Sequence, residues 1–170
     1  VTFADGADII TASAGTSNFR AGVNAGNSIA SGGNYNVVVG DEAGTAITTG
    51  DNNVAVGYKS LEDNTTGSNN TALGYSALEA NTTADDNVAV GYKALEINTT
   101  GASNTALGRQ ALQANTTASS NTAVGYSALY ANTTGSNNVS IGKDSLIANT
   151  TAASNVAIGV DAMDANTTGG

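Results

Sequence analysis

The residues of this chain that could do chemistry are carboxylates, tyrosines, amides and hydroxyls, because it contains no Cys and no His. Disulfides, the usual zinc sites, and nucleophiles or bases built on Cys or His are therefore excluded. Asp85 and Asp86 are adjacent, but they occur in one repeat unit only. Glutamates recur at intervals of 17 residues, and the same position then drifts to other residue types, which is typical of a solvated face; the series is Glu62, Glu79, Glu96, Gln113, Tyr130, Ile147 and Asp164.

No metal or substrate motif accompanies these carboxylates. Calcium needs several convergent oxygens, and the GGxGxD calcium-binding repeat is missing. The chain also lacks a phosphate loop and a GxSxG motif. We therefore predict no enzyme activity, no catalytic residue, no cofactor and no required metal.

A row of aromatic and basic residues is the candidate binding site. It recurs at intervals of 17 residues and comprises Tyr58, Tyr75, Tyr92, Arg109 and Tyr126. Exposed Tyr rings could stack against sugar rings, with Arg adding polar contacts. The alternative, which we favour, is that the Tyr side chains pack against the next unit or a neighbouring chain, since buried aromatics dominate interface energetics. If the chain binds a glycan or receptor, this row is the predicted site.

Two rows of Asn recur in step with the tyrosines. Stacked Asn amides that hydrogen-bond from unit to unit are a common structural device, so we predict a structural ladder at Asn53, Asn70, Asn87, Asn104, Asn121, Asn138 and Asn155. The second row opens each NTT triplet and fits the N-x-[ST] glycosylation pattern. Asn also tolerates left-handed backbone and favours turns, which is the alternative reading of NTT.

The paired Thr residues, such as Thr65 and Thr66, have a further interpretation. Regular Thr arrays on solenoids can order water and bind ice. Adjacent residues of a strand point to opposite faces, so we expect the two Thr side chains to diverge, and turn chemistry is a sufficient explanation for them.

All these rows follow from one repeat unit, which is well represented by NTAVGYSALYANTTGSN at 121–137. Numbering each unit from its opening Asn, position 5 is Gly and position 12 opens the NTT triplet. A fixed period without insertions is the mark of a solenoid or array. We predict three regions: an N-terminal cap or junction at 1–17, two divergent first coils at 18–52, and seven regular 17-residue repeats at 53–170.

The pattern within a unit favours β-structure. Positions 1–5 alternate with β-branched residues, as in a strand. The xxAL segment is compatible with a second strand or one helical turn, and we favour the strand. Position 4 is a large aliphatic and position 9 is Leu or Met, so we expect a thin core from these two. Burying both yields roughly 1.5–3 kcal/mol each, whereas ordering each residue costs about 1–2 kcal/mol. No unit is stable alone, and so thin a core favours association of several chains.

Composition limits the partners. The formal net charge is −9 with five basic residues, which excludes the basic stripe of a nucleic-acid-binding surface. No run approaches a membrane-spanning length, so we expect no membrane insertion. Residue 1 is Val and no leader pattern is visible, so we expect a fragment or a processed chain.

The motif Asn-x-Ala-x-Gly resembles the head repeats of trimeric autotransporter adhesins. It occurs as NVAVG at 53–57, NTALG at 70–74, NTAVG at 121–125 and NVAIG at 155–159. The longer unit GYxALxxNTTGxxN is similar to repeat regions of marine bacteriophage tail-fibre proteins. The resemblance covers 18–170 and implies a left-handed parallel β-roll, a homotrimer about a common axis, and a passive surface-binding role. Adhesin head coils are a few residues shorter, and the extra residues here lie in the ALxxNTT part.

The sequence therefore predicts an all-β parallel β-solenoid of β-roll type with 17-residue coils. The expected function is that of a structural fibre segment, which acts as a rigid spacer and takes part in host-surface attachment. Its expected location is extracellular, in a virion tail fibre or on a bacterial surface. The expected partners are two further copies of the chain and a host-cell glycan or receptor. The alternative is a monomeric solenoid that binds ice or a glycan.

Overall fold

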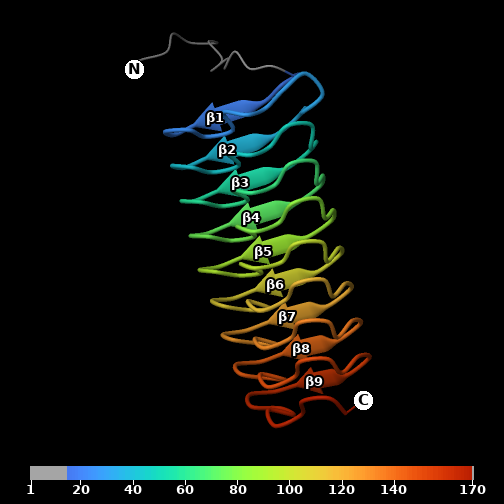
Figure 1. Cartoon of the computed structure of the whole chain (residues 1–170). Coiled ribbons are helices and arrows are strands. Elements are labelled where there is room, and N and C mark those ends of the chain that lie inside the picture. The colour runs from blue at the N-terminus through green and yellow to red at the C-terminus, as the bar shows by residue number, and fades with distance from the viewer. Residues whose placement is uncertain (1–14, 170) are drawn as a thin grey trace.

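The computed structural model describes residues 15–169, which form one parallel β-solenoid (Figure 1). Each coil contributes one short strand, and the strands stack in sequence order into a nine-stranded parallel sheet. The strands are β1 (Phe19–Ala21), β2 (Val37–Val39), β3 (Val54–Val56), β4 (Thr71–Leu73), β5 (Val88–Val90), β6 (Thr105–Leu107), β7 (Thr122–Val124), β8 (Val139–Ile141) and β9 (Val156–Ile158).

The strand register fixes the coil length. Val54 pairs with Thr71, 17 residues further on, and the same interval holds from β2 to β9. Phe19 pairs with Val37, so the first coil has one extra residue. The described residues contain no helix. The prediction of an all-β parallel solenoid with 17-residue coils is therefore confirmed, while most of the predicted cap at 1–17 lies outside the described residues.

The second half of each coil is a chain of turns, and the expectation of a second strand in the xxAL segment is wrong. Left-handed backbone is the physical reason. In the coil that starts with β5, Lys93, Leu95 and Ser103 have φ angles of 56°, 51° and 59°. A strand cannot contain such residues. They let the chain bend sharply, so that its backbone groups meet those of the next coil.

The interior is thinner than expected. In the regular coils, the Asn before the strand (position 1) and the Ala or Ser at its centre (position 3) point inward and are buried, as Asn70 and Ala72 are. The residues at positions 2 and 4 point outward, because successive side chains alternate between faces. The expectation that position 4 belongs to the core is wrong: Leu73 is 45% exposed and Leu107 is 37% exposed. The apolar core consists of Ala at positions 3 and 8 and Leu at position 9.

The first two coils fill the same interior with different residues. In the regular coils, positions 3, 9 and 12 are Ala, Leu and Asn; in the coil of β2 they are Val38, Gly44 and Ile47. A Cβ added to Gly44 would lie 2.8 Å from Ile47 Cδ1 and 3.1 Å from Val38 Cγ1. The larger side chains at positions 3 and 12 therefore occupy the space that Leu fills elsewhere. This exchange explains why these coils can stack on the regular ones despite lacking the Leu.

Hydrogen bonds between coils extend beyond the sheet. In the turns, Ser76 N–H donates to the Tyr58 carbonyl (2.9 Å), and Leu61 N–H donates to the Ala77 carbonyl (3.0 Å). Thr65 N–H donates to the Thr82 carbonyl (2.8 Å). Buried backbone groups left without partners are costly, so this continuous ladder stabilises every side of the coil. It makes each turn as regular as the strand that precedes it.

Candidate functional site

The predicted row at position 6 forms a continuous stack along one edge of the solenoid. The ring centroids of Tyr58 and Tyr75 are 5.3 Å apart, and those of Tyr75 and Tyr92 are also 5.3 Å apart, with the second pair nearly parallel at 19°. The Arg109 guanidinium lies between two rings, 5.4 Å from the centroid of Tyr92 and 5.5 Å from that of Tyr126. The structure therefore brings all five predicted site residues together.

Stacking determines which parts of these residues a ligand could reach. Each Tyr of the row is 39–46% exposed, yet the faces of the inner rings are covered by their neighbours. Packing against the next coil, the favoured alternative, accounts for this geometry. The ring edges, the phenolic hydroxyls and part of the Arg109 guanidinium are what the row presents to solvent.

Lysines at position 7 line the same edge and are paired with acids. Lys59 Nζ lies 3.5 Å from Glu42 Oε2 and 3.0 Å from Glu62 Oε2, and Lys93 Nζ lies close to Glu96 Oε1 at 2.6 Å. Hydrogen bonding to Glu96 raises the pKa of Lys93 above its usual value, and Glu62 does the same for the pKa of Lys59. These ammonium groups therefore keep their charge. The stability that their ion pairs contribute to the fold is lost only as the pH rises through the raised pKa.

The Asn ladder at position 1 is buried and bonded from coil to coil. Asn70 N–H donates to Asn53 Oδ1 (2.9 Å), and Asn53 Nδ2 donates to the Gly67 carbonyl at the end of its own coil (2.9 Å). Its members from Asn53 to Asn138 are at most 1% exposed. From Asn53 to Asn138, each side-chain oxygen thus satisfies a buried backbone N–H of the next coil. Most of the side-chain nitrogens donate to a buried carbonyl that the Asn at position 12 also bonds, whereas Asn121 Nδ2 donates to Asn104 Oδ1 (3.2 Å).

The Asn of the NTT triplet forms a second internal ladder. Asn81 Nδ2 donates to Asn64 Oδ1 (2.9 Å) and to the Ala84 carbonyl (3.1 Å). Six members are fully buried, which places their amide nitrogens out of reach of a glycosylating enzyme in the folded protein; these are Asn64, Asn81, Asn98, Asn115, Asn132 and Asn149. The two Thr of each triplet form a bend, as the turn interpretation expects, but the Asn residues that open the triplets do not have left-handed backbone.

One surface was not anticipated from the sequence, namely the outer face of the sheet. It is made of the side chains at positions 2 and 4 of every coil. None of these side chains is charged from β1 to β9, and several are exposed aliphatics, including Leu73, Leu107 and Ile141. The large aliphatic at position 4 could have indicated this surface. It lies next to the inward-facing residue at position 3, so in a strand it must face outward, but the sequence pattern placed it in the core.

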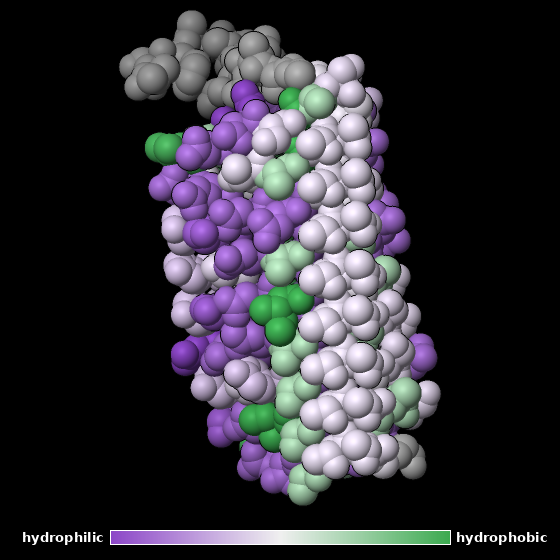
Figure 2. Space-filling model, in the orientation of Figure 1, coloured by the Kyte–Doolittle hydropathy of each residue, from purple (hydrophilic) through white to green (hydrophobic). Residues whose placement is uncertain are grey.

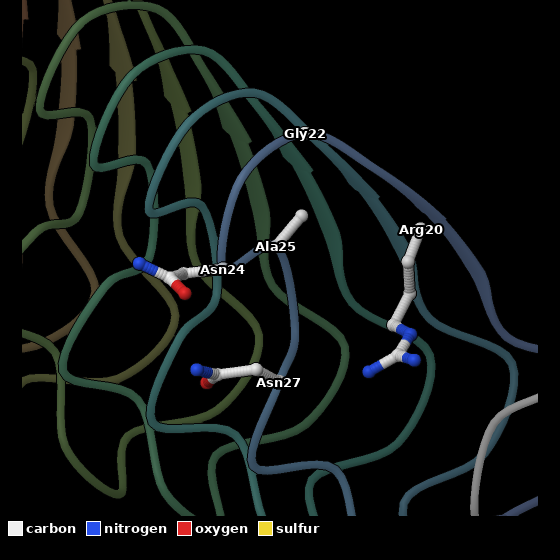
Figure 3. Close-up of a pocket in the computed structure, with 5 residues that line it drawn as sticks. All are labelled: Arg20, Gly22, Asn24, Ala25 and Asn27. Carbon is white, nitrogen blue, oxygen red and sulfur yellow. The ribbon is translucent and has the colours of Figure 1, made fainter.

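A pocket of about 420 Å³ lies at the first coil (Figure 3). Arg20 takes the inward position 3 and donates from Nη1 to the Gly26 carbonyl (2.7 Å), and its Nε is buried without a partner. Figure 3 places Asn24 and Asn27 on the opposite arm of the coil from Arg20. The Gly at position 9 creates the space that this long side chain occupies.

The carboxylates of the described residues do not gather into a site. No group of three or more Asp or Glu within 15–169 is arranged to hold a metal ion. Glu96 is bonded to Lys93 and to Gln113 along the position-10 column. Among the same residues there is no helix long and apolar enough to cross a membrane.

Comparison with models of protein families, with curated proteins and with solved structures finds no match to this chain.

Proposed function

We propose that this chain is a segment of an extracellular fibre, in which three copies associate along the outer faces of their sheets. The uncharged face formed by positions 2 and 4, which is largely aliphatic and carries Thr71, Thr105 and Thr122 at position 2, is the observation that carries this proposal. It runs along all nine strands, with Leu73 and Leu107 among its exposed members. Contiguous apolar patches on this scale are typical of protein interfaces. The left-handed β-roll of the adhesin heads is the packing we expect for each copy.

Charge supports the same surface. The chain carries a formal net charge of −9, so copies that approach one another repel unless the contact avoids acids. The outer face of the sheet does so, whereas the opposite side carries Glu62, Glu79 and Glu96. Association through this face would bury the aliphatic side chains that the thin interior cannot hold. The resulting rod would be stiff, because every coil is bonded to its neighbours.

The mass in solution tests the assembly. We expect light scattering after size exclusion to give three times the 16.6 kDa of one chain. Leu73→Lys together with Leu107→Lys should give a folded monomer, because charges on the shared face repel. Ile97→Lys is the matched control, since Ile97 is a similarly exposed aliphatic (42%) outside the sheet. A monomeric wild-type chain would remove the proposal.

Attachment to a host-surface glycan or receptor is the second part of this proposal, and the stack at position 6 is the surface we assign to it. Its exposed hydroxyls and the guanidinium of Arg109 are hydrogen-bonding groups suited to a glycan. Replacing Tyr58, Tyr75, Tyr92 and Tyr126 by Phe keeps the stack but removes the hydroxyls. We expect glycan or cell binding to fall while the mass and the circular dichroism spectrum stay unchanged. Unchanged binding would leave the stack with a packing role alone. The location follows from these roles: a virion tail fibre or a bacterial surface.

A further inference from the structure

The paired threonines form one continuous surface. Every coil from the second to the ninth has Thr at positions 13 and 14. Position 14 is exposed throughout, with the members Thr49, Thr66, Thr83, Thr100, Thr117, Thr134, Thr151 and Thr168. The expectation that the two Thr side chains diverge was based on a strand, but the segment is a bend, and position 13 is also partly exposed to solvent. Figure 2 shows a pale, unbroken column along the rod on the face that carries these residues.

The fold explains the Thr at position 13. Its hydroxyl donates to the carbonyl of the same position in the next coil, as from Thr65 Oγ1 to the Thr82 carbonyl (3.0 Å) and from Thr99 Oγ1 to the Thr116 carbonyl (3.0 Å). This bond repeats from the second coil to the eighth. Position 13 therefore has a structural role that also holds the coils at a constant spacing.

The fold does not explain the Thr at position 14. In the described coils its hydroxyl makes no hydrogen bond to the protein, whereas the hydroxyl of Thr65 beside it does. Turn chemistry, in which a Thr hydroxyl bonds to nearby backbone, therefore does not account for this residue. Eight unpaired hydroxyls and eight methyl groups are presented to solvent in register.

Other exposed positions of the same units change along the chain. Position 6 varies between Tyr, Arg, Lys and Val, and position 10 between Glu, Gln, Tyr, Ile and Asp. Position 17 is Asn, Asp or Ser in the regular coils. Among these four surface columns, position 14 alone keeps one residue type in every coil from the second to the ninth. Its residue type therefore matters at the surface.

The chemistry of this surface limits what it can bind. Parallel coils repeat about every 4.8 Å, and positions 13 and 14 carry no charge and no aromatic ring from Thr48 to Thr168. This surface therefore suits a ligand that is uncharged, repeats at the same interval, and makes contacts with both hydroxyl and methyl groups. We propose that this double column of threonines binds the surface of ice, whose oxygen lattice repeats at a similar interval. The rigidity of the solenoid favours this binding, because the threonine array is already ordered before it contacts the ice lattice and loses little conformational entropy on binding.

Ice affinity is tested with the full chain and two triple variants. Thr83→Lys, Thr100→Lys and Thr117→Lys together interrupt the middle of the column. Ser103→Lys, Ser120→Lys and Ser154→Lys together are the control, since these residues are equally exposed, lie outside the double column, and have the left-handed backbone that Lys59 also adopts. Circular dichroism and mass check that both variants fold and assemble as the wild type does.

We expect the wild type to shape ice crystals and to produce thermal hysteresis. The Thr variant should lose at least about nine-tenths of the hysteresis, while the control keeps it. A wild-type chain without ice shaping or hysteresis overturns the proposal, as does an equal loss in both variants. Binding to crystalline cellulose or chitin in place of ice also overturns it. Because the threonines lie outside the sheet, this result is independent of the trimer measurement.

Discussion

Left-handed backbone at non-glycine residues is the most unusual feature at the residue scale. The first six regular coils have it at positions 7, 9 and 17, as at Lys93, Leu95 and Ser103, and the last has it at positions 7 and 9. A side chain costs about 1–2 kcal/mol in this conformation. At position 9 the burial of Leu offsets that cost, since Leu95 is fully buried. Position 17 has no such compensation, because Ser103 is exposed.

Glycine at position 17 should therefore stabilise the protein. We expect Ser103→Gly to raise the free energy of unfolding by about 0.5–1 kcal/mol, as the relief of backbone strain exceeds the greater entropy that glycine loses on folding. Ala102→Gly is the matched control at a neighbouring position outside the left-handed region, and it should lower stability by about 0.5–1 kcal/mol. Thermal or urea unfolding measures both. A destabilised Ser103→Gly variant would mean that the strain is absent.

At the Asn ladder, in contrast, we expect a substitution to destabilise the protein. Asn104 Oδ1 accepts the Asn121 N–H (3.0 Å), and Asn104 Nδ2 donates to the Ala118 carbonyl (2.8 Å). In Asn104→Ala the Asn121 N–H and Asn121 Nδ2, which both donate to Asn104 Oδ1, stay buried without partners at roughly 1–3 kcal/mol each. The Ala118 carbonyl keeps its bond from Asn115 Nδ2 (3.0 Å). We expect a loss of roughly 2–5 kcal/mol in urea unfolding.

Asn69→Ala tests whether burial is the reason. Asn69 is exposed, and the bond from its side chain to Asp86 lies at the surface. We expect a loss of at most about 1 kcal/mol for this variant, because Asn69 has a φ angle of 60° and Ala tolerates this left-handed backbone less well than Asn. Similar losses in Asn69→Ala and Asn104→Ala would contradict the explanation from unsatisfied buried groups.

At the scale of a coil, positions 3, 9 and 12 act as one unit of packing. Val38, Gly44 and Ile47 fill the interior of the coil of β2, where the next coil has Ala55, Leu61 and Asn64. The close approach of Ile47 Cδ1 to the Cβ position of Gly44 shows that Leu does not fit there alone.

The effects of Val38→Ala, Gly44→Leu and Ile47→Asn on the free energy of unfolding should therefore be non-additive. We expect Gly44→Leu alone to lose about 1–3 kcal/mol through overpacking. Adding the other two changes should restore most of that loss, since the coil then has the regular set and its Asn can join the ladder at Asn64. Unfolding of the single, double and triple variants measures the coupling. Additive losses would show that the three positions are independent.

The sequence predicted the coil period and the parallel stacking because 17-residue spacing is visible in every column. It predicted correctly that Leu at position 9 faces inward, but it wrongly placed position 4 in the core. Leu73 and Leu78 are equally hydrophobic, but only Leu78 is buried, because a three-residue strand and its turns enclose room for Ala on one side and Leu on the other. For the candidate site, the row at position 6 was visible, whereas the stacking of its rings depends on side-chain geometry. The left-handed turns were missed because Leu and Lys do not favour them.

At the scale of the whole molecule, stability comes from contacts between neighbouring coils. Gly91 N–H donates to the Leu73 carbonyl (2.8 Å), and Gly159 N–H donates to the Ile141 carbonyl (2.7 Å) in the equivalent position. The coil of Gly91 has a neighbour on each side, and β9 pairs with β8 alone. Stability in such arrays is approximately a sum of coil and interface terms.

Hydrogen exchange should report this difference. We expect the Gly91 amide to exchange at least about tenfold more slowly than the Gly159 amide, because opening a middle coil breaks two interfaces instead of one. The two amides share residue type, coil position and partner type, so their intrinsic rates are similar. Equal protection at both would indicate that the rod unfolds as a single unit.

The distinct interiors of the first two coils have a consequence for how the chain finds its alignment. The seven regular units have the same spacing, so neighbouring segments can pair out of alignment by one repeat and lose the contacts of only one coil. Such shifted pairings are kinetic traps, because their energy is close to that of the native state. Arg20, Val38 and the Gly–Ile exchange match no other layer, and the 18-residue spacing from β1 to β2 occurs once among the described coils. These features allow only one alignment of the first two coils, and that alignment fixes the position of every later coil. In an assembly of several copies, the same features would set the axial stagger of the chains.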